Sequence, residues 1–168
     1  MDWLCDEMLG RLARLLRAAG HDTVLAAGGT EDNRLLAQAR GEGRVLLTRD
    51  RPLAAKAAAD GFLVTGETVE EQARSLTAAF RLDWLHAPFT RCLVDNTPVR
   101  PASAAEVAGL PLPVRDLGGP FTTCPACGRL YWPGGHVRRL ALRLEALTRA
   151  CQSESTGWNL QKKDSECD

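Results

Sequence analysis

Residues 1–26 read MDWLCDEMLG RLARLLRAAG HDTVLA, and the spacing of their apolar positions changes twice. The apolar run at residues 1–5 predicts a strand, and residues 7–19 follow a helical period. Gly20 is typical of the position that ends a helix, and residues 22–26 predict a second strand. One helix face carries apolar side chains and another carries arginines: Met8, Leu12, Leu15, Leu16 and Ala19 against Arg11, Arg14 and Arg17.

The same alternation continues to residue 80. Thr30 is a candidate N-cap for a helix over residues 31–40, which Gly41 and Gly43 would close. Residues 44–48 predict the clearest strand, an Ala-rich helix follows, and residues 62–65 and 69–80 predict a further strand and helix. Alternating strands and helices predict an α/β fold with a parallel sheet flanked by helices, whose ligands bind beyond the carboxyl ends of the strands.

Composition divides the chain further along. Residues 88–150 hold most of the prolines and eight arginines against four acidic residues, although the whole chain of 168 residues has no net charge. We expect a domain over residues 1–87, a loop-rich module with a helix at 138–150 over residues 88–150, and a polar tail at 151–168. No apolar run approaches the ~20 residues that a membrane helix needs, which predicts a cytoplasmic protein without a membrane partner.

Three aspartates follow the predicted strands. Asp6 directly follows the first strand, Asp50 follows the third by two residues, and Asp32 lies in the first turn after the second. They should meet at one sheet edge, where Mg²⁺ or Mn²⁺ could neutralise them and promote hydrolysis of a phosphodiester. The alternative is that each aspartate caps a helix or a turn.

A second chemistry uses some of the same positions. Receiver domains of two-component signalling place an acidic pair, a phosphoacceptor aspartate and a threonine after successive strands, and Asp6, Glu7, Asp50 and Thr65 could occupy these positions. A receiver also needs a fifth strand that ends in lysine, which the Pro-rich sequence after residue 80 does not supply.

Cysteine spacing predicts a metal site in the later module. Cys124-Pro125-Ala126-Cys127 is a two-residue-spaced pair typical of a zinc knuckle, and Cys92 lies about thirty residues upstream.

Two segments together resemble the Mut7-C RNase domain, a PIN-like nuclease family with an appended zinc ribbon. The first is LCDEMLGRLARLLR (4–17) and the second GRVLLTRDR (43–51), while RCLV (91–94), CPACG (124–128) and YWPG (131–134) resemble the ribbon. The resemblance covers residues 3–145 and implies a metal-dependent ribonuclease, with Asp6, Asp32 and Asp50 holding Mg²⁺ or Mn²⁺.

The ribbon departs from the family pattern at one position. The family has Cys-x-x-Cys near Cys92, whereas Asp95 stands at the second cysteine here. Zn²⁺ could be held by Cys92, Asp95, Cys124 and Cys127, or His136 could replace the carboxylate. The ribbon could also be metal-free and packed around Tyr131 and Trp132.

Basic residues suggest how RNA is held. Arg11, Arg49 and Arg51 are candidate substrate-binding residues, the last two because they flank Asp50. Although a tryptophan in a small module is more often a core residue, arginines and aromatic residues are interleaved in the ribbon in a pattern that proteins commonly use to hold single-stranded RNA: Arg91, Arg100, Arg129, Arg138 and Arg139 with Tyr131 and Trp132. We therefore predict an endoribonuclease that acts on single-stranded or structured RNA, and the alternative is an RNA-binding adaptor without catalysis.

Overall fold

The predicted parallel sheet is present in the computed structural model, which describes the backbone of residues 1–160 and the side chains of residues 1–150. Its strands are β1 (Trp3–Cys5), β2 (Thr23–Leu25), β3 (Val45–Thr48) and β4 (Gly61–Leu63), in the order β2-β1-β3-β4. All three pairings are parallel, with Leu4 of β1 opposite Val24 and Leu46. The α/β fold class is confirmed.

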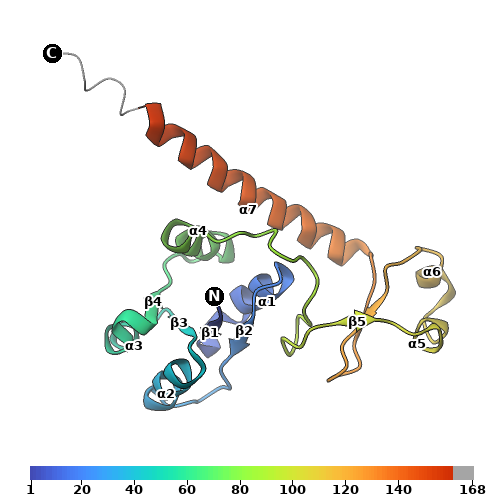
Figure 1. Ribbon diagram of the computed structural model, residues 1–168, viewed down its shortest axis with the longest axis horizontal. Coiled ribbons are helices and arrows are strands. Elements are labelled where there is room, and N and C mark those ends of the chain that lie inside the picture. The colour runs from blue at the N-terminus through green and yellow to red at the C-terminus, as the bar shows by residue number, and fades with distance from the viewer. Residues whose placement is uncertain (161–168) are drawn as a thin grey trace.

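Helices cover both faces of this sheet (Figure 1). The connections contain the 3₁₀ turn η1 (Glu7–Leu9), α1 (Gly10–Ala18), α2 (Asp32–Glu42), α3 (Arg51–Ala57), the 3₁₀ turn η2 (Ala58–Asp60) and α4 (Val69–Phe80). Helices α1 and α4 pack on one face, and α2 and α3 pack on the other.

The alternation of side chains along the strands produces these two layers. Trp3, Cys5 and Leu47 point into the core beneath α1 and α4, whereas Leu4 and Leu46 point toward α2 and α3. All five are fully buried. Each such large apolar side chain contributes about 1.5–3 kcal/mol on burial, so the short strands are held mainly by what packs against them.

The later module leaves this core and returns to it. The antiparallel strands β5 (Arg100–Pro101), β6 (Thr122–Thr123) and β7 (Leu130–Tyr131) form a separate small sheet. The short helices α5 (Ala104–Ala108) and α6 (Leu112–Arg115) lie between β5 and β6. Helix α7 (Gly135–Leu160) then packs along α4, with Leu144 and Leu147 buried in the core of the first layer.

Several local expectations were wrong. Met8 is 66% exposed, because it lies in the tighter 3₁₀ turn η1 and not in the predicted α-helix. Thr30 does not cap α2, because the cap position is Glu31 and the Thr30 hydroxyl donates to the Ala27 carbonyl. Helix α7 exceeds the predicted 138–150 at both ends. Residues 161–168 of the predicted polar tail lie outside the described residues.

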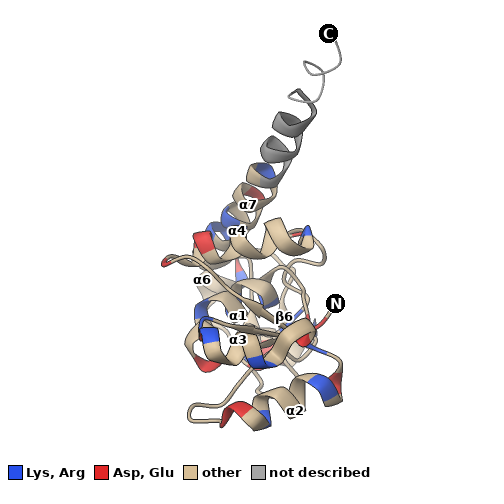
Figure 2. Ribbon diagram, turned by 90° about the vertical axis from the view of Figure 1, so that its left-hand side faces the viewer, with Lys and Arg blue, Asp and Glu red and all other residues tan. Residues whose placement is uncertain are grey.

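The structure also bears on the receiver interpretation and on membrane spanning. Within residues 1–160 the parallel sheet has four strands, without the fifth that a receiver requires, so the receiver interpretation is wrong. Among the helices of the described part, none combines the length and apolar character needed to cross a bilayer. Basic and acidic residues are distributed over several helices, and α7 carries both (Figure 2).

Candidate active site and metal centre

The carboxyl ends of β1 and β3 are joined by one hydroxyl group. Asp6 follows β1 and is 9% exposed; its Oδ1 accepts from the Glu7 N–H at 2.7 Å, and its Oδ2 accepts from Thr48 Oγ1 at 2.8 Å. Thr48 Oγ1 in turn accepts from the Asp50 N–H at 3.0 Å. The last residue of β3 therefore links the carboxylate of Asp6 to the backbone of Asp50.

The carboxylates of Asp50 and Asp32 lie at the starts of two helices. Asp50 caps α3, because its Oδ1 accepts from the Leu53 N–H at 2.9 Å. Asp32 is the first residue of α2, and its Oδ2 accepts from Lys56 Nζ at 2.8 Å. The hydrogen bond and charge of Asp32 raise the pKa of Lys56, and the charge of Asp50 adds to this effect. Lys56 is therefore a cation beside two of the three aspartates.

We call Asp6, Asp32 and Asp50 the acidic edge. Their chemistry suits Mg²⁺ or Mn²⁺, which prefer carboxylate oxygens. Within the described residues, Asp32 Oδ1 and Asp50 Oδ2 accept no hydrogen bond and remain available. The three do not, however, form a group whose ligand atoms all lie within 4.8 Å of one another; among the described residues only the cysteine-containing cluster described below does so.

The predicted substrate-binding arginines are close to this edge in sequence, because Arg49 and Arg51 flank Asp50 and Arg11 follows Asp6 by five residues. Arg49 donates to the exposed Glu67 at 2.8 Å. Arg11 and Arg51 are exposed, and neither forms an ion pair within the described part of the chain. Glu7 is engaged elsewhere, because its Oε2 accepts from the Gly29 N–H at 2.6 Å.

A second set of ligands does converge. Cys92, Asp95, Cys124 and Cys127 each offer a ligand atom, and these atoms all lie within 4.8 Å of one another. The sulfurs of Cys92 and Cys127 are 3.7 Å apart, and Cys124 Sγ lies 3.3 Å from Asp95 Oδ2. Zn–S bonds of about 2.3 Å place two sulfurs about 3.8 Å apart in a tetrahedron. The cluster could therefore hold a metal ion such as zinc.

The backbone explains why Asp95 belongs to this set. In residues 92–97, the Cys92 N–H donates to the Thr97 carbonyl and the Asn96 N–H donates to the Cys92 carbonyl. Residues 124–129 repeat this pattern: the Cys124 N–H donates to the Arg129 carbonyl, and the Gly128 N–H donates to the Cys124 carbonyl. Asn96 and Gly128 also share a positive φ, 74° and 70°. We call these segments the first and second knuckles, and Asp95 occupies in the first the position of Cys127 in the second.

Two residues near the cluster differ from the sequence interpretation. His136 is not a member of the cluster; it is exposed at the start of α7 and its Nδ1 accepts from Arg139 at 3.0 Å. Tyr131, expected as a stacking residue or a packing residue, places its hydroxyl 3.1 Å from Cys92 Sγ, where it also accepts from the Leu93 N–H. A hydroxyl in this position can donate to a thiolate and orient it.

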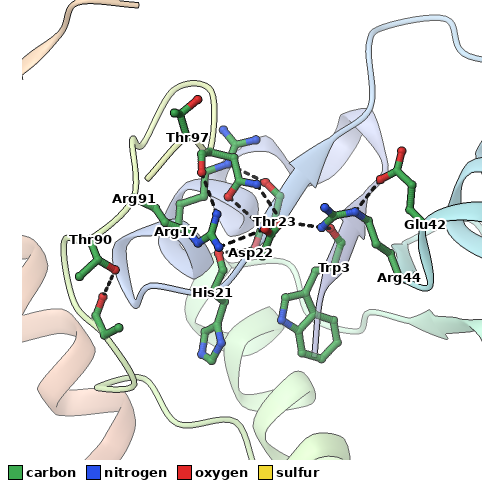
Figure 3. Close-up of polar contacts among 12 residues, drawn as sticks. Trp3, Arg17, His21, Asp22, Thr23, Glu42, Arg44, Thr90, Arg91 and Thr97 are labelled. Carbon is green, nitrogen blue, oxygen red and sulfur yellow. Dashed lines mark hydrogen bonds and ion pairs between the residues drawn. The ribbon is translucent and has the colours of Figure 1, made fainter. Parts of the chain in front are cut away.

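The first knuckle is fastened to the sheet by a buried arginine that the sequence placed on an exposed face. Arg17 is 5% exposed, and it donates to the Thr23 carbonyl at 2.8 Å (Figure 3). It also donates to the carbonyls of Leu93 at 3.3 Å and Val94 at 2.7 Å. Periodicity could not reveal this role, because Leu93 lies 76 residues further along the chain.

A carboxylate at the start of β2 strengthens the same attachment (Figure 3). Asp22 pairs with Arg44 at 2.5 Å and Arg91 at 3.0 Å, and accepts from the Asn96 amide at 2.9 Å. Burial opposes ionisation of Asp22, but the hydrogen bonds from Arg44 and Asn96 outweigh it and lower the pKa. Asn96 Oδ1 also accepts from the Thr23 N–H at 2.9 Å, so the knuckle and the sheet share one hydrogen-bond network.

Comparisons with known proteins identify a family for this chain. The family model for the Mut7-C RNAse domain matches residues 1–144. A curated human protein, Exonuclease mut-7 homolog, is 34% identical over 99 residues, which is 55% of this chain and 11% of that protein. The chain thus matches only a small part of that relative's length. No solved structure matches the chain.

Proposed function

Because the chain belongs to the Mut7-C RNAse domain family and so has a nuclease-family role, we propose that it is a metal-dependent endoribonuclease whose site is the acidic edge. The observation that carries this proposal is the Thr48 hydroxyl, which links the Asp6 carboxylate to the Asp50 backbone N–H at the carboxyl edge of a parallel sheet. Ligands of such sheets bind at this edge. The proposed substrate is single-stranded or structured RNA.

Each aspartate has a distinct part in the proposed site. Asp6 is held from two sides and provides the rigid centre, while Asp50 and Asp32 each keep an oxygen available for a ligand. Mg²⁺ or Mn²⁺, when bound, lowers the pKa of a water molecule and stabilises negative charge on a phosphoryl oxygen. The cation has to compete with Lys56 for Asp32.

The arginines would position the RNA backbone. Arg11 and Arg51 are exposed and can donate to phosphate oxygens. Arg49 can do so once it leaves Glu67, and an exposed ion pair of this kind contributes only about 0–1 kcal/mol. These three residues therefore offer donors without disturbing the core.

We further propose that the knuckles hold a structural Zn²⁺. Two of its ligands, Cys92 and Cys124, are buried, and the complete set of four leaves no position open for substrate. In this proposal residues 1–87 form the nuclease domain, and residues 88–150 form a zinc-ribbon-like module that α7 fastens back to α4.

A specific observation favours the second candidate, an RNA-binding adaptor without catalysis. Asp6 and Asp50 each accept from a nearby backbone N–H, and Asp32 is neutralised by Lys56. Carboxylates with such partners need no metal ion to be stable at this edge.

One experiment separates these functions. A circular RNA has no ends, so only an endonuclease can open it, and the assay follows its linearisation with Mn²⁺ on a denaturing gel. We expect Asp6→Asn to slow cleavage more than about 100-fold, because residues that merely orient metal ligands already contribute 10–100-fold. Asp116→Asn, which changes an exposed aspartate in the ribbon, is the matched control and should cleave like the wild type.

The other outcomes are equally clear. Cleavage of linear RNA alone would show an exonuclease. Tight RNA binding without cleavage of either form, in the wild type and in Asp6→Asn, would establish the adaptor. Equal cleavage by the wild type and Asp6→Asn would show that the reaction does not use the acidic edge.

A further inference from the structure

A cavity of about 790 Å³ lies between helix α1, strand β7 and the start of α7. Its volume is in the range of pockets that enclose a small ligand, about 300–1,000 Å³. Its lining combines cationic and aromatic side chains, among them Arg14, Arg129, Arg139, Arg143, His136 and Trp132. We call it the basic cavity.

The positive charge of the basic cavity is not neutralised by acidic residues in its lining. None of its lining residues is Asp or Glu. Within the described residues, Arg143 is the only one of its four arginines with an acidic partner, Glu70 at 2.5 Å. The Nε of Arg143 is buried and has no hydrogen-bond partner in the described part of the chain. Like charges gathered without a counterion repel one another, so this arrangement favours an anionic ligand.

The backbone adds to the same preference. Gly134 and Gly135 line the cavity at the point where α7 begins, and the first turn of a helix has N–H groups without intrahelical acceptors. Gly134 has no side chain to cap them. A Cβ on Gly134 would lie 2.9 Å from Trp132 Nε1, so the glycine allows the indole to pack against the backbone. An anion site and an aromatic side chain therefore share one cavity.

Helix α1 connects this cavity to the acidic edge. It begins at Gly10, four residues after Asp6, and carries exposed Arg11 and Arg14 three residues apart. Residues at this spacing are neighbours on a helix surface. Arg14 lines the basic cavity, and it lies only about 6 Å along the axis from the helix start. A nucleic-acid backbone can therefore follow the two arginines from one site to the other.

We propose that the basic cavity binds an unpaired nucleotide of the RNA strand whose backbone reaches the acidic edge. Its phosphate is bound by Arg129, Arg139 and the start of α7, and its base stacks on Trp132. An arginine-rich surface with an aromatic platform is how proteins hold unpaired bases. The site would anchor the substrate at a distance from the scissile bond. This inference rests on the proposed function only in taking RNA as the substrate.

The test measures binding without cleavage. Fluorescence anisotropy follows a fluorescein-labelled single-stranded RNA 12-mer binding to the full chain with Zn²⁺ but no added Mg²⁺ or Mn²⁺, and a gel confirms that the RNA stays intact. We expect Trp132→Leu to weaken binding about 5- to 150-fold, as loss of one stacked base does. The double variant Arg129→Gln/Arg139→Gln should also make the dependence of log K on log salt shallower, by about 0.7 per lost phosphate contact.

Controls separate a lost site from a lost fold. Arg115→Gln removes an exposed ribbon arginine that does not line the cavity, and it should bind RNA with nearly wild-type affinity. Thermal unfolding shows whether Trp132→Leu folds, and the double variant changes only exposed residues, so it supplies the result if Trp132→Leu does not.

Three results would overturn the inference: unchanged affinity and salt dependence in the double variant, equal weakening by Arg115→Gln, or equal competition by a poly-glutamate peptide, which would indicate an acidic protein partner. Different results would refute the proposed function. If the wild type binds RNA through the basic cavity but does not cleave it, catalysis is refuted and the nucleotide site stands. If the wild type cleaves RNA but the cavity variants bind it as tightly as the wild type, the nucleotide site is refuted and catalysis stands.

Discussion

Replacing Arg17 with methionine tests how strongly the first knuckle is fastened to the sheet. Methionine keeps much of the apolar stem but removes the guanidinium, which leaves the carbonyls of Thr23, Leu93 and Val94 without their donor. Two of the lost hydrogen bonds are short, 2.8 and 2.7 Å, and the third is 3.3 Å. Because Arg17 is 5% exposed, water cannot readily replace it.

The expected loss follows from these contacts. A hydrogen bond to a charged group contributes about 1.5–3 kcal/mol, so the two short bonds give about 3–6 kcal/mol. Removing a buried charge recovers some desolvation energy, which leaves a loss of about 3 kcal/mol in the free energy of unfolding. For a chain of this size that lowers Tm by about 6–12 °C. We also expect faster loss of Zn²⁺ to a chelator, because Leu93 and Val94 lie between two of the proposed ligands.

Calorimetry and a colorimetric chelator measure the two effects. Arg14→Met is the matched control, because Arg14 lies on the same helix but is exposed and forms no ion pair within the described residues. Its Tm should stay within about 2 °C of the wild type. If Arg17→Met unfolds as the control does, the buried guanidinium does not fasten the knuckle, and the reasoning is refuted.

Three further changes test other contacts. Asp95→Cys should slow Zn²⁺ loss to a chelator at least tenfold, because thiolate is the preferred ligand of structural zinc, whereas Asp116→Cys should not. Because the pKa of Asp22 is lowered in the folded state, its contribution to stability is present above about pH 4 and is lost as pH falls through the folded-state pKa. Urea titrations should therefore show that the free energy of unfolding of Asp22→Asn falls less steeply below about pH 4 than that of the wild type, and an equal slope would contradict this. Lys56→Ala should lower the Mn²⁺ concentration for half-maximal cleavage about two- to fivefold, because it removes a competing cation from the acidic edge. The control is Arg34→Ala, which removes an exposed cation of α2, and an equal shift in this control would count against the prediction.

Regular periodicity made the first half of the fold predictable. The helix at 69–80 was predicted with the bounds that α4 has, and in the structure a Thr68 capping box marks its start. The parallel sheet followed from the alternation of strands and helices. The two short helices after Pro101 were missed, because four or five residues carry too little periodicity to stand out among prolines.

Long-range contacts account for what the sequence did not reveal. Arg17 has the same helical spacing as Arg11 and Arg14, and only the arrival of residues 93 and 94 buries it. The clustering of Cys92, Asp95, Cys124 and Cys127 was among the alternatives that the sequence offered, because Asp95 keeps the two-residue spacing of a knuckle. The acidic edge stays a prediction, since strand ends bring the three aspartates to one edge of the sheet but do not determine whether their carboxylates turn toward a common ion.

The return of α7 to the core has a consequence for anyone who shortens this protein. Leu144 and Leu147 cover apolar side chains of the first layer, including Leu76. A fragment that stops at residue 87 would expose this apolar surface to solvent and would be prone to self-association. Both knuckles lie between Phe89 and Leu140, and these two residues pack against the same core cluster. The two knuckles thus interrupt a fold whose core is completed by α7, which follows them in the chain.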